Sequence, residues 1–186
     1  NVRWDFYGKP PPGPGQNPKS KEFREDWQQQ VWRNYESIMT RGLKGQKNYT
    51  INWAMPAETY GTMYSNMDVA IAPLQMNEFN DSKSEIKVAE CGAYSVPLVA
   101  SDVGCYNETI KNGQTGYLIP VDAPKRVWVS TLTKVIKDKK HREEMGKNLK
   151  KITDEYFDLN KVVKHRLDLY DTVFQVKGVT LNGVQR

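Results

Sequence analysis

The sequence predicts an α/β protein built on a doubly wound parallel sheet. Short apolar runs alternate along the chain with segments of helical periodicity, which is the pattern of repeated strand–helix units. Two runs, 69–74 and 96–101, are continuously apolar, as is typical of parallel strands buried on both faces. The 186 residues include 38% hydrophobic ones, enough to form one core. We therefore expect one domain over residues 1–175 and a tail over residues 176–186.

The first third of the chain is expected to hold two strands and a long helix. Residues 2–7 alternate apolar with polar side chains, and residues 10–18 form a loop rich in Pro and Gly. A helix is predicted from Ser20 to just before Gly42. Its apolar stripe consists of Phe23, Trp27, Val31 and Ile38. Apolar and polar side chains alternate again at residues 49–53, which predicts the second strand. A short helix is predicted from Pro56 through Tyr60 and Tyr64.

The rest of the chain continues the alternation and then becomes helical. Strands are predicted at 69–74, 96–101 and 117–119, and a helix at 82–94. Three further helical stripes follow. Their members are Leu132, Val135 and Ile136, then Met145, Leu149 and Ile152, then Leu159, Val162, Val163 and Tyr170.

Composition excludes some classes of protein and leaves others open. No apolar run approaches the roughly 20 residues that span a bilayer, and no apolar leader opens the sequence, so we expect a cytoplasmic protein. The net charge of +5 suits an anionic ligand, an anionic membrane or nucleic acid, or simply a surface rich in Lys. Cys91 and Cys105 form no Cys-x-x-Cys pair and lie far from both His, which argues against zinc and favours two buried, reduced thiols.

Ligands of doubly wound sheets bind beyond the carboxyl ends of the strands, here the loops 8–19, 53–58, 74–83 and 101–106. Ser82 and Glu85 have the spacing of a capping box at a helix start. The simpler interpretation is a well-capped helix. The functional one is a phosphate site, because the N–H groups of a helix start bind anions and Lys83 adds a charge. Glu90, further along this helix, would then accept the hydroxyls of a ribose.

A series of segments resembles a known family when taken in order. The segments are Asp68–Leu74, Lys83–Ala93, Val96–Gly104, Glu108–Ile110 and Asn112–Leu118. Their order and spacing resemble the donor-binding half of the group 1 glycosyltransferases of the GT-B fold, strongly over residues 47–120. The resemblance implies a Rossmann-like domain, one half of a GT-B fold.

The resemblance also implies roles for individual residues. The glutamate that holds the donor ribose corresponds to Glu90. The amides that hold the diphosphate correspond to Lys83, Ser84, Glu85 and Ile86. The nucleobase is expected against Trp53, Ala54 and Met55, although Trp53 is equally explained as a core aromatic. The implied substrate is a UDP- or GDP-sugar, with no further cofactor.

The sequence departs from the family pattern at two points. The first motif glutamate corresponds to Ser82, so either the sugar is held differently or Asn80, Asp81 or Lys83 takes that role. The chain is also too short for both halves of a GT-B enzyme. We expect it to lack the first strand and helix of the donor half, and an N-terminal acceptor-binding domain to exist in the parent protein; a natural short protein and a fragment both remain open. Since Asp81 belongs to no Asp-x-Asp pair, no metal site is predicted.

The resulting prediction is a donor-binding domain of a retaining, metal-independent glycosyltransferase of glycan biosynthesis. The parent would be an enzyme of the hexosyltransferase type, and no catalytic residue is assigned in this chain. The alternative is a non-catalytic Rossmann-like domain that binds a nucleotide or a protein partner. Basic residues between Lys134 and Lys151 form either a solvated helix face or a patch for an anionic membrane surface, which would make the protein peripheral to the membrane. We expect no nucleic acid partner.

Overall fold

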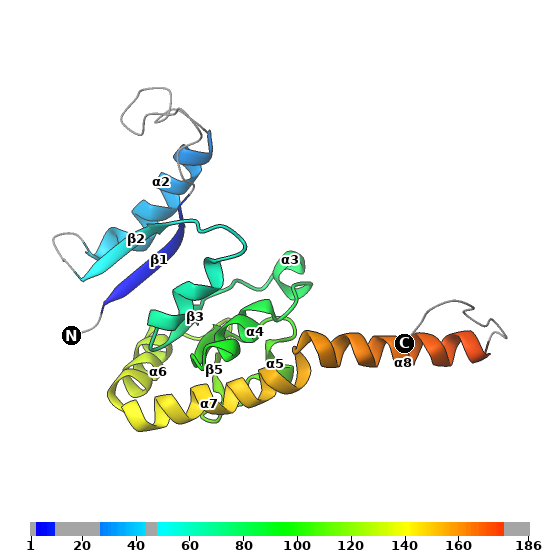
Figure 1. Cartoon of the computed structure of the whole chain (residues 1–186). Coiled ribbons are helices and arrows are strands. Elements are labelled where there is room, and N and C mark those ends of the chain that lie inside the picture. The colour runs from blue at the N-terminus through cyan, green and yellow to red at the C-terminus, as the bar shows by residue number, and fades with distance from the viewer. Residues whose placement is uncertain (1–2, 10–26, 44–47, 177–186) are drawn as a thin grey trace. The chain divides into compact units, whose positions relative to one another are not determined.

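The computed structural model describes residues 3–9, 27–43 and 48–176 (Figure 1). The chain divides into two compact units, the N-terminal unit Asn1–Gly61 and the C-terminal unit Thr62–Arg186. The predicted Pro/Gly loop at 10–18, the start of the first helix at Ser20 and the tail from 177 lie outside the described residues. The boundaries of the domain expected over residues 1–175 stay a prediction.

The N-terminal unit contains a parallel pair of strands. Strand β1 (Trp4–Lys9) pairs with β2 (Tyr49–Trp53), and the register shifts between Tyr7 and Lys9. The connection includes helix α2 (Trp27–Thr40) and a 3-10 turn, η1 (Arg41–Leu43). Both predicted strands are confirmed, and the helix ends before Gly42 as expected.

The C-terminal unit is built on a parallel sheet of three strands in the order β3-β4-β5. These are β3 (Ala70–Ala72), β4 (Leu98–Ser101) and β5 (Gly116–Ile119). Every residue of the central strand β4 is buried, which explains its continuous apolar run. The described strands thus form two parallel sheets where one was expected. Strand β3 is only three residues long, so its outer edge offers few backbone groups to another strand.

Helices cover both faces of this sheet. Since alternate residues of a strand point to opposite faces, Leu98 and Ala100 join one buried cluster with Val88, Cys91 and Leu149. Val99 joins the other, with Ile119, Val135 and Met145. The remaining elements are the 3-10 helix η2 (Tyr60–Asn66) and the helices α3 (Glu78–Asp81), α4 (Ile86–Ala93), α5 (Tyr106–Thr109), α6 (Lys125–Lys137), α7 (Lys139–Tyr156) and α8 (Leu159–Val176). The three predicted C-terminal helices are confirmed, whereas the short helices α3 and α5 were not predicted.

Helices α4 and α7 pack against each other at very close range (Figure 1). A Cβ atom on Gly92 of α4 would lie 1.8 Å from Oγ1 of Thr153, and one on Gly146 of α7 would lie 1.9 Å from the backbone oxygen of Ser95. Glycine is therefore required at both positions. The contact fixes α4 between the sheet and α7.

The end of α4 is a Schellman motif. The Val96 N–H donates to the Cys91 oxygen at 2.9 Å, and the Ser95 N–H donates to the Gly92 oxygen at 3.0 Å. Ser95 occupies the position where glycine is usual and has φ of 58°. This left-handed conformation strains an L-residue because its Cβ crowds the carbonyl oxygen.

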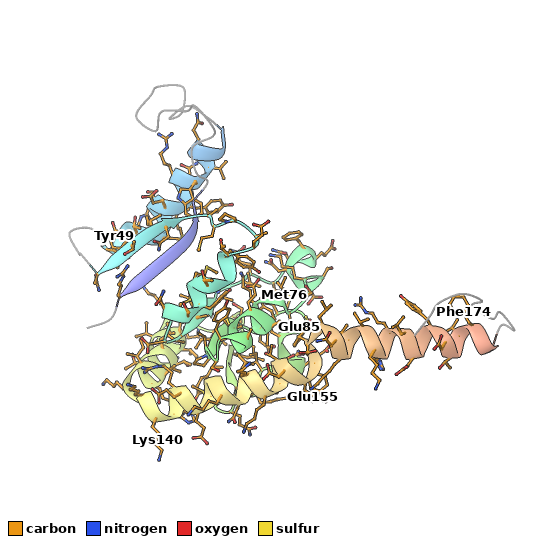
Figure 2. The ribbon with its side chains drawn as sticks, in the orientation of Figure 1. Tyr49, Met76, Glu85, Lys140, Glu155 and Phe174 are labelled. Atoms are coloured by element: carbon orange, nitrogen blue, oxygen red, sulfur yellow. The ribbon has the colours of Figure 1, made fainter. Side chains whose placement is uncertain are left out.

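Helix α8 has a broad apolar face that the described residues leave largely uncovered. Leu159 is 73% exposed, and Val163, Leu167, Tyr170 and Val173 of the same face are exposed as well. Figure 2 shows side chains standing off this helix along its length, as far as the labelled Phe174. None of the described helices combines the length and the apolar character that crossing a bilayer requires.

The close contact of α4 and α7 gives a first prediction. Gly146→Ala should lower the free energy of unfolding by about 2–3 kcal/mol, because the new methyl group meets backbone atoms. At a solvent-exposed helix position a Gly→Ala change instead raises the free energy of unfolding by about 1 kcal/mol. The sign of the change therefore tests whether the close contact exists. Urea denaturation measures it, with Gly42→Ala as the control because nothing lies within 4 Å of that position. A stabilised Gly146→Ala variant would contradict the contact.

The strained end of α4 gives a second prediction. Ser95→Gly should raise the free energy of unfolding by about 0.5–1 kcal/mol, since glycine adopts the left-handed conformation without the Cβ clash. Thermal melts of the two proteins at equal concentration test this. Ser95→Ala keeps the strain and should show no gain.

Candidate functional site

The start of α4 differs from the capping box that the sequence predicted. The helix begins at Ile86, four residues after the expected start, and Ser82 instead ends the short helix α3. The Ser82 hydroxyl donates to the Glu78 oxygen at 2.7 Å. Glu85 occupies the cap position of α4 without a side-chain cap bond. The capping-box prediction is therefore wrong, because Asn77 caps an unforeseen helix upstream and this helix uses Ser82 as its end.

The loop leading into α4 presents backbone donors. The Lys83 N–H donates to the Asn80 oxygen at 3.3 Å and so belongs to the end of α3. Within the described part of the chain, the N–H groups of residues 84–87 have no hydrogen-bond acceptor. Of the four residues predicted to hold a diphosphate, Ser84, Glu85 and Ile86 thus contribute such amides and Lys83 does not. The Lys83 ammonium lies 4.5 Å from the centre of the exposed Phe79 ring.

Glu90 lies one turn into α4, with its carboxylate held by two other side chains. The Tyr64 hydroxyl donates to its Oε2 at 2.7 Å, and the Lys87 ammonium donates to the same oxygen at 2.8 Å. The Glu90 side chain retains 12% exposure. Sequence reasoning missed both partners. The i, i+3 spacing of Lys87 and Glu90 was a usable signal, whereas nothing in the sequence marked Tyr64.

A second carboxylate near the start of α4 is bound from the loop after β4. The Cys105 thiol donates to Oε2 of Glu85 at 2.8 Å, and its sulfur also lies 3.2 Å from the Lys83 oxygen. Gly104, with φ of 60°, lies so close to the Asp81 oxygen that a Cβ would be 3.0 Å from it. The Leu74 N–H, after β3, donates to Oγ of Ser101 at 2.8 Å. These contacts join the loops at 74–83 and 101–106, two of the loops predicted to border the site. Figure 2 labels Glu85 at this junction.

The residues predicted to meet the nucleobase lie in the other unit. Trp53 is the last residue of β2, and Ala54 and Met55 follow it as exposed residues of the N-terminal unit. Their place at the carboxyl end of a parallel strand agrees with the sequence expectation. Their role stays a prediction.

Comparison with known proteins decides the family. Residues 29–152 match the family model described as glycosyl transferases group 1, which is well over half of the chain. The chain belongs to the group 1 glycosyltransferases. The resemblance found in the ordered motifs is thereby confirmed.

Individual relatives of this glycosyltransferase chain are distant. It is 25% identical over 111 residues to the capsular polysaccharide biosynthesis glycosyltransferase CapM of Staphylococcus aureus, covering 60% of this chain and 28% of CapM. Its fold matches sucrose-phosphate synthase from Thermosynechococcus elongatus with a TM-score of 0.71 at 17% identity, covering 92% of this chain and 38% of that one. It also matches Anabaena HepE, solved with UDP and glucose, with a TM-score of 0.65 at 11% identity, covering 92% and 49%.

These matches establish the fold as a Rossmann-like half of the GT-B type. The chain spans 28% of the length of the curated relative, and less than half of each of the two solved structures.

Neither cysteine of the glycosyltransferase chain is suited to nucleophilic catalysis. Burial raises the pKa of the Cys91 thiol to about 12. Partial burial, followed by the hydrogen bond to Glu85, raises the pKa of Cys105 to about 11. Both thiols therefore stay protonated at neutral pH. The prediction that both are buried holds for Cys91 but is wrong for Cys105, which is half-buried because it reaches from the surface of one loop to the next.

The basic segment of the glycosyltransferase chain is partly neutralised by its own acidic residues. On α7, Lys139 lies 3.7 Å from Glu143 and Lys150 lies 2.8 Å from Asp154. Arg142 is buried and donates to backbone oxygens at the end of α6 and to Asp68. The choice between a solvated helix face and a membrane patch is not tested by these pairs, and membrane binding stays a prediction.

The thiol–carboxylate contact gives a third prediction. A pKa raised to about 11 leaves the Cys105 thiol almost entirely protonated at about pH 7.5, so its alkylation should be about tenfold or more slower than in the unfolded chain. The rate should rise with pH until about pH 11. Glu85→Gln should accelerate it, because the carboxylate that holds the proton is removed. Mass spectrometry after timed iodoacetamide treatment reports each cysteine separately, and a plateau near pH 8 would contradict the assignment.

Proposed function

We propose that this chain binds the nucleotide-sugar donor of a retaining, metal-independent glycosyltransferase. The observation that carries the proposal is the arrangement on α4, where amides without acceptors and the carboxylate of Glu90 are separated by about one helical turn. Helix-start amides attract phosphate oxygens, and a carboxylate accepts hydrogen bonds from sugar hydroxyls. A nucleoside diphosphate has phosphate oxygens and ribose hydroxyls at a spacing comparable to that between these amides and the Glu90 carboxylate.

In this proposal the diphosphate meets the amides of residues 84–87 and the ribose meets Glu90. The side chain of a helical residue leans toward the helix N-terminus, which brings the Glu90 carboxylate toward the amides. The presence of UDP in the Anabaena HepE structure supports a nucleotide ligand of this class. The base is then expected at Trp53, Ala54 and Met55.

The proposed chemistry is largely electrostatic. As the bond between sugar and phosphate breaks, negative charge grows on the leaving diphosphate, and the helix-start amides stabilise it together with nearby lysines. Glu90 acts as a binding residue in this scheme and moves no proton. Transfer itself needs an acceptor held in register with the donor, which we assign to an acceptor-binding domain of the parent protein.

Metal independence is part of the proposal. In the ranges 3–9, 27–43 and 48–176, no three His, Cys, Asp or Glu side chains are grouped so that they would hold a metal ion. Amides and lysine ammonium groups would take the role that a divalent cation has beside a diphosphate.

Calorimetric titration with UDP and with GDP tests the proposal. We expect one of the two nucleotides to bind, with equal affinity in EDTA and in Mg²⁺. Glu90→Gln should weaken this binding by about 1–3 kcal/mol, the cost of losing a hydrogen bond to a charged group. The matched control is Glu144→Gln, an exposed residue of α7 with the same change of charge.

Each part of the proposal has its own contrary result. If neither nucleotide binds, the donor site is wrong. If Glu90→Gln binds as the parent does, the ribose is held elsewhere. Loss of binding in EDTA would refute metal independence. Release of UDP or GDP from the sugar nucleotide would separate an active donor site from a domain that only binds.

A further inference from the structure

Tyr64 is a buried tyrosine whose hydroxyl is directed at the carboxylate of Glu90. It lies in η2, retains 3% exposure and donates to Oε2 of Glu90 at 2.7 Å. The two residues are 26 positions apart, so the bond joins η2 to α4. A hydroxyl–carboxylate bond of this length is a strong, charge-assisted hydrogen bond.

The core holds the Tyr64 ring in place. The ring belongs to the buried cluster that includes Val88 and Cys91 of α4 and Leu98 of β4. It also stacks on Tyr94, with ring centres 6.1 Å apart and planes inclined by 25°. Because close-packed side chains occupy single rotamers, the position of the hydroxyl is fixed by the fold.

Lys87 approaches the same carboxylate oxygen from the first turn of α4. Its ammonium is 2.8 Å from Oε2 of Glu90 and 3.3 Å from the Tyr64 hydroxyl. The side chain is exposed, so its position is less restrained than that of Tyr64. The two donors therefore differ. Lys87 places a positive charge beside the Glu90 carboxylate, and Tyr64 donates a hydrogen bond from a fixed position.

We propose that Tyr64 is a positioning residue that orients Glu90 toward the ribose and so makes the site prefer ribonucleotides over 2′-deoxyribonucleotides. The inference rests on the proposed function of Glu90. A carboxylate that recognises two adjacent hydroxyls must be held in one orientation, and bonds made by a fixed group lose less conformational entropy. A nucleotide without the 2′-hydroxyl then leaves the fixed carboxylate with an unmade hydrogen bond, which costs affinity.

Lys87 has a separate task in this scheme. A carboxylate within one helical turn of a diphosphate repels it, and the ammonium between them offsets the repulsion. Removing Lys87 should weaken every ligand that carries the diphosphate by a similar factor. It should leave the preference for ribose unchanged, because Tyr64 still orients Glu90.

The test compares UDP, 2′-deoxy-UDP and inorganic pyrophosphate by calorimetry, or the guanine pair if GDP is the nucleotide that binds. In Tyr64→Phe we expect the affinity for UDP to fall about 5–10-fold, with the ratio of UDP to 2′-deoxy-UDP affinity falling toward one. The affinity for pyrophosphate should stay within about twofold. In Lys87→Met we expect all three affinities to fall together while the ratio is kept.

Tyr106→Phe is the matched control, since Tyr106 is buried in the same cluster and its loss tests the removal of a core hydroxyl alone. The proposal is overturned if Tyr64→Phe keeps the parent's ratio while Glu90→Gln loses it, an outcome that leaves the proposed function intact. It is also overturned if Lys87→Met removes the preference for UDP over 2′-deoxy-UDP. This second test can be made even if Tyr64→Phe does not fold. Absence of nucleotide binding by the parent chain refutes the proposed function itself.

Discussion

The close approach of α4 to α7 is the constraint on which the C-terminal unit depends. Two glycines, Gly92 and Gly146, let the helix backbones come closer than side chains allow, and the chain leaves α4 through the strained residue Ser95. These contacts fix the C-terminal end of α4 against α7, and the rest of the helix is positioned with it. Groups on α4 inherit that precision, which loops alone do not provide.

Side chains from other elements hold the carboxylates near the start of α4. Tyr64 holds Glu90, and Cys105 holds Glu85, so each carboxylate near the start of α4 has a donor from another element. Such bonds stabilise the local structure, since a half-buried carboxylate without a donor is costly. They also limit which orientations the carboxylates adopt, which is what recognition of a small polar ligand requires.

Sequence reasoning succeeded where the signal is periodic and failed where two local signals compete. Strands β2, β4 and β5 and helices α6 to α8 follow from alternation and apolar stripes, because burial dictates both. Ser82 and Glu85 fit a capping box, but the Asn77 cap upstream creates α3 and uses Ser82 as its end. The contacts of Tyr64 with Glu90 and of Cys105 with Glu85 span 26 and 20 residues, and a single sequence has no pattern at such separations. Glu90 was predicted as a ribose acceptor from its place on the helix, and the resemblance of the motifs assigned it the same role, which still awaits the binding experiment.

The apolar face of α8 has a consequence for the helix–coil equilibrium of this segment. Isolated helices shorter than about 12–15 residues are marginal in water, and α8 with 18 residues is little longer. Most of the stability of a helix in a protein comes from burial of its apolar face, and on α8 this face is exposed to solvent in the described part of the chain. The helicity of α8 is therefore thermodynamically linked to the burial of this face. A surface that buried this face would supply part of the free energy that orders the helix. The helix propensity of the α8 sequence would then contribute to the affinity of that surface for α8 as directly as its apolar residues do.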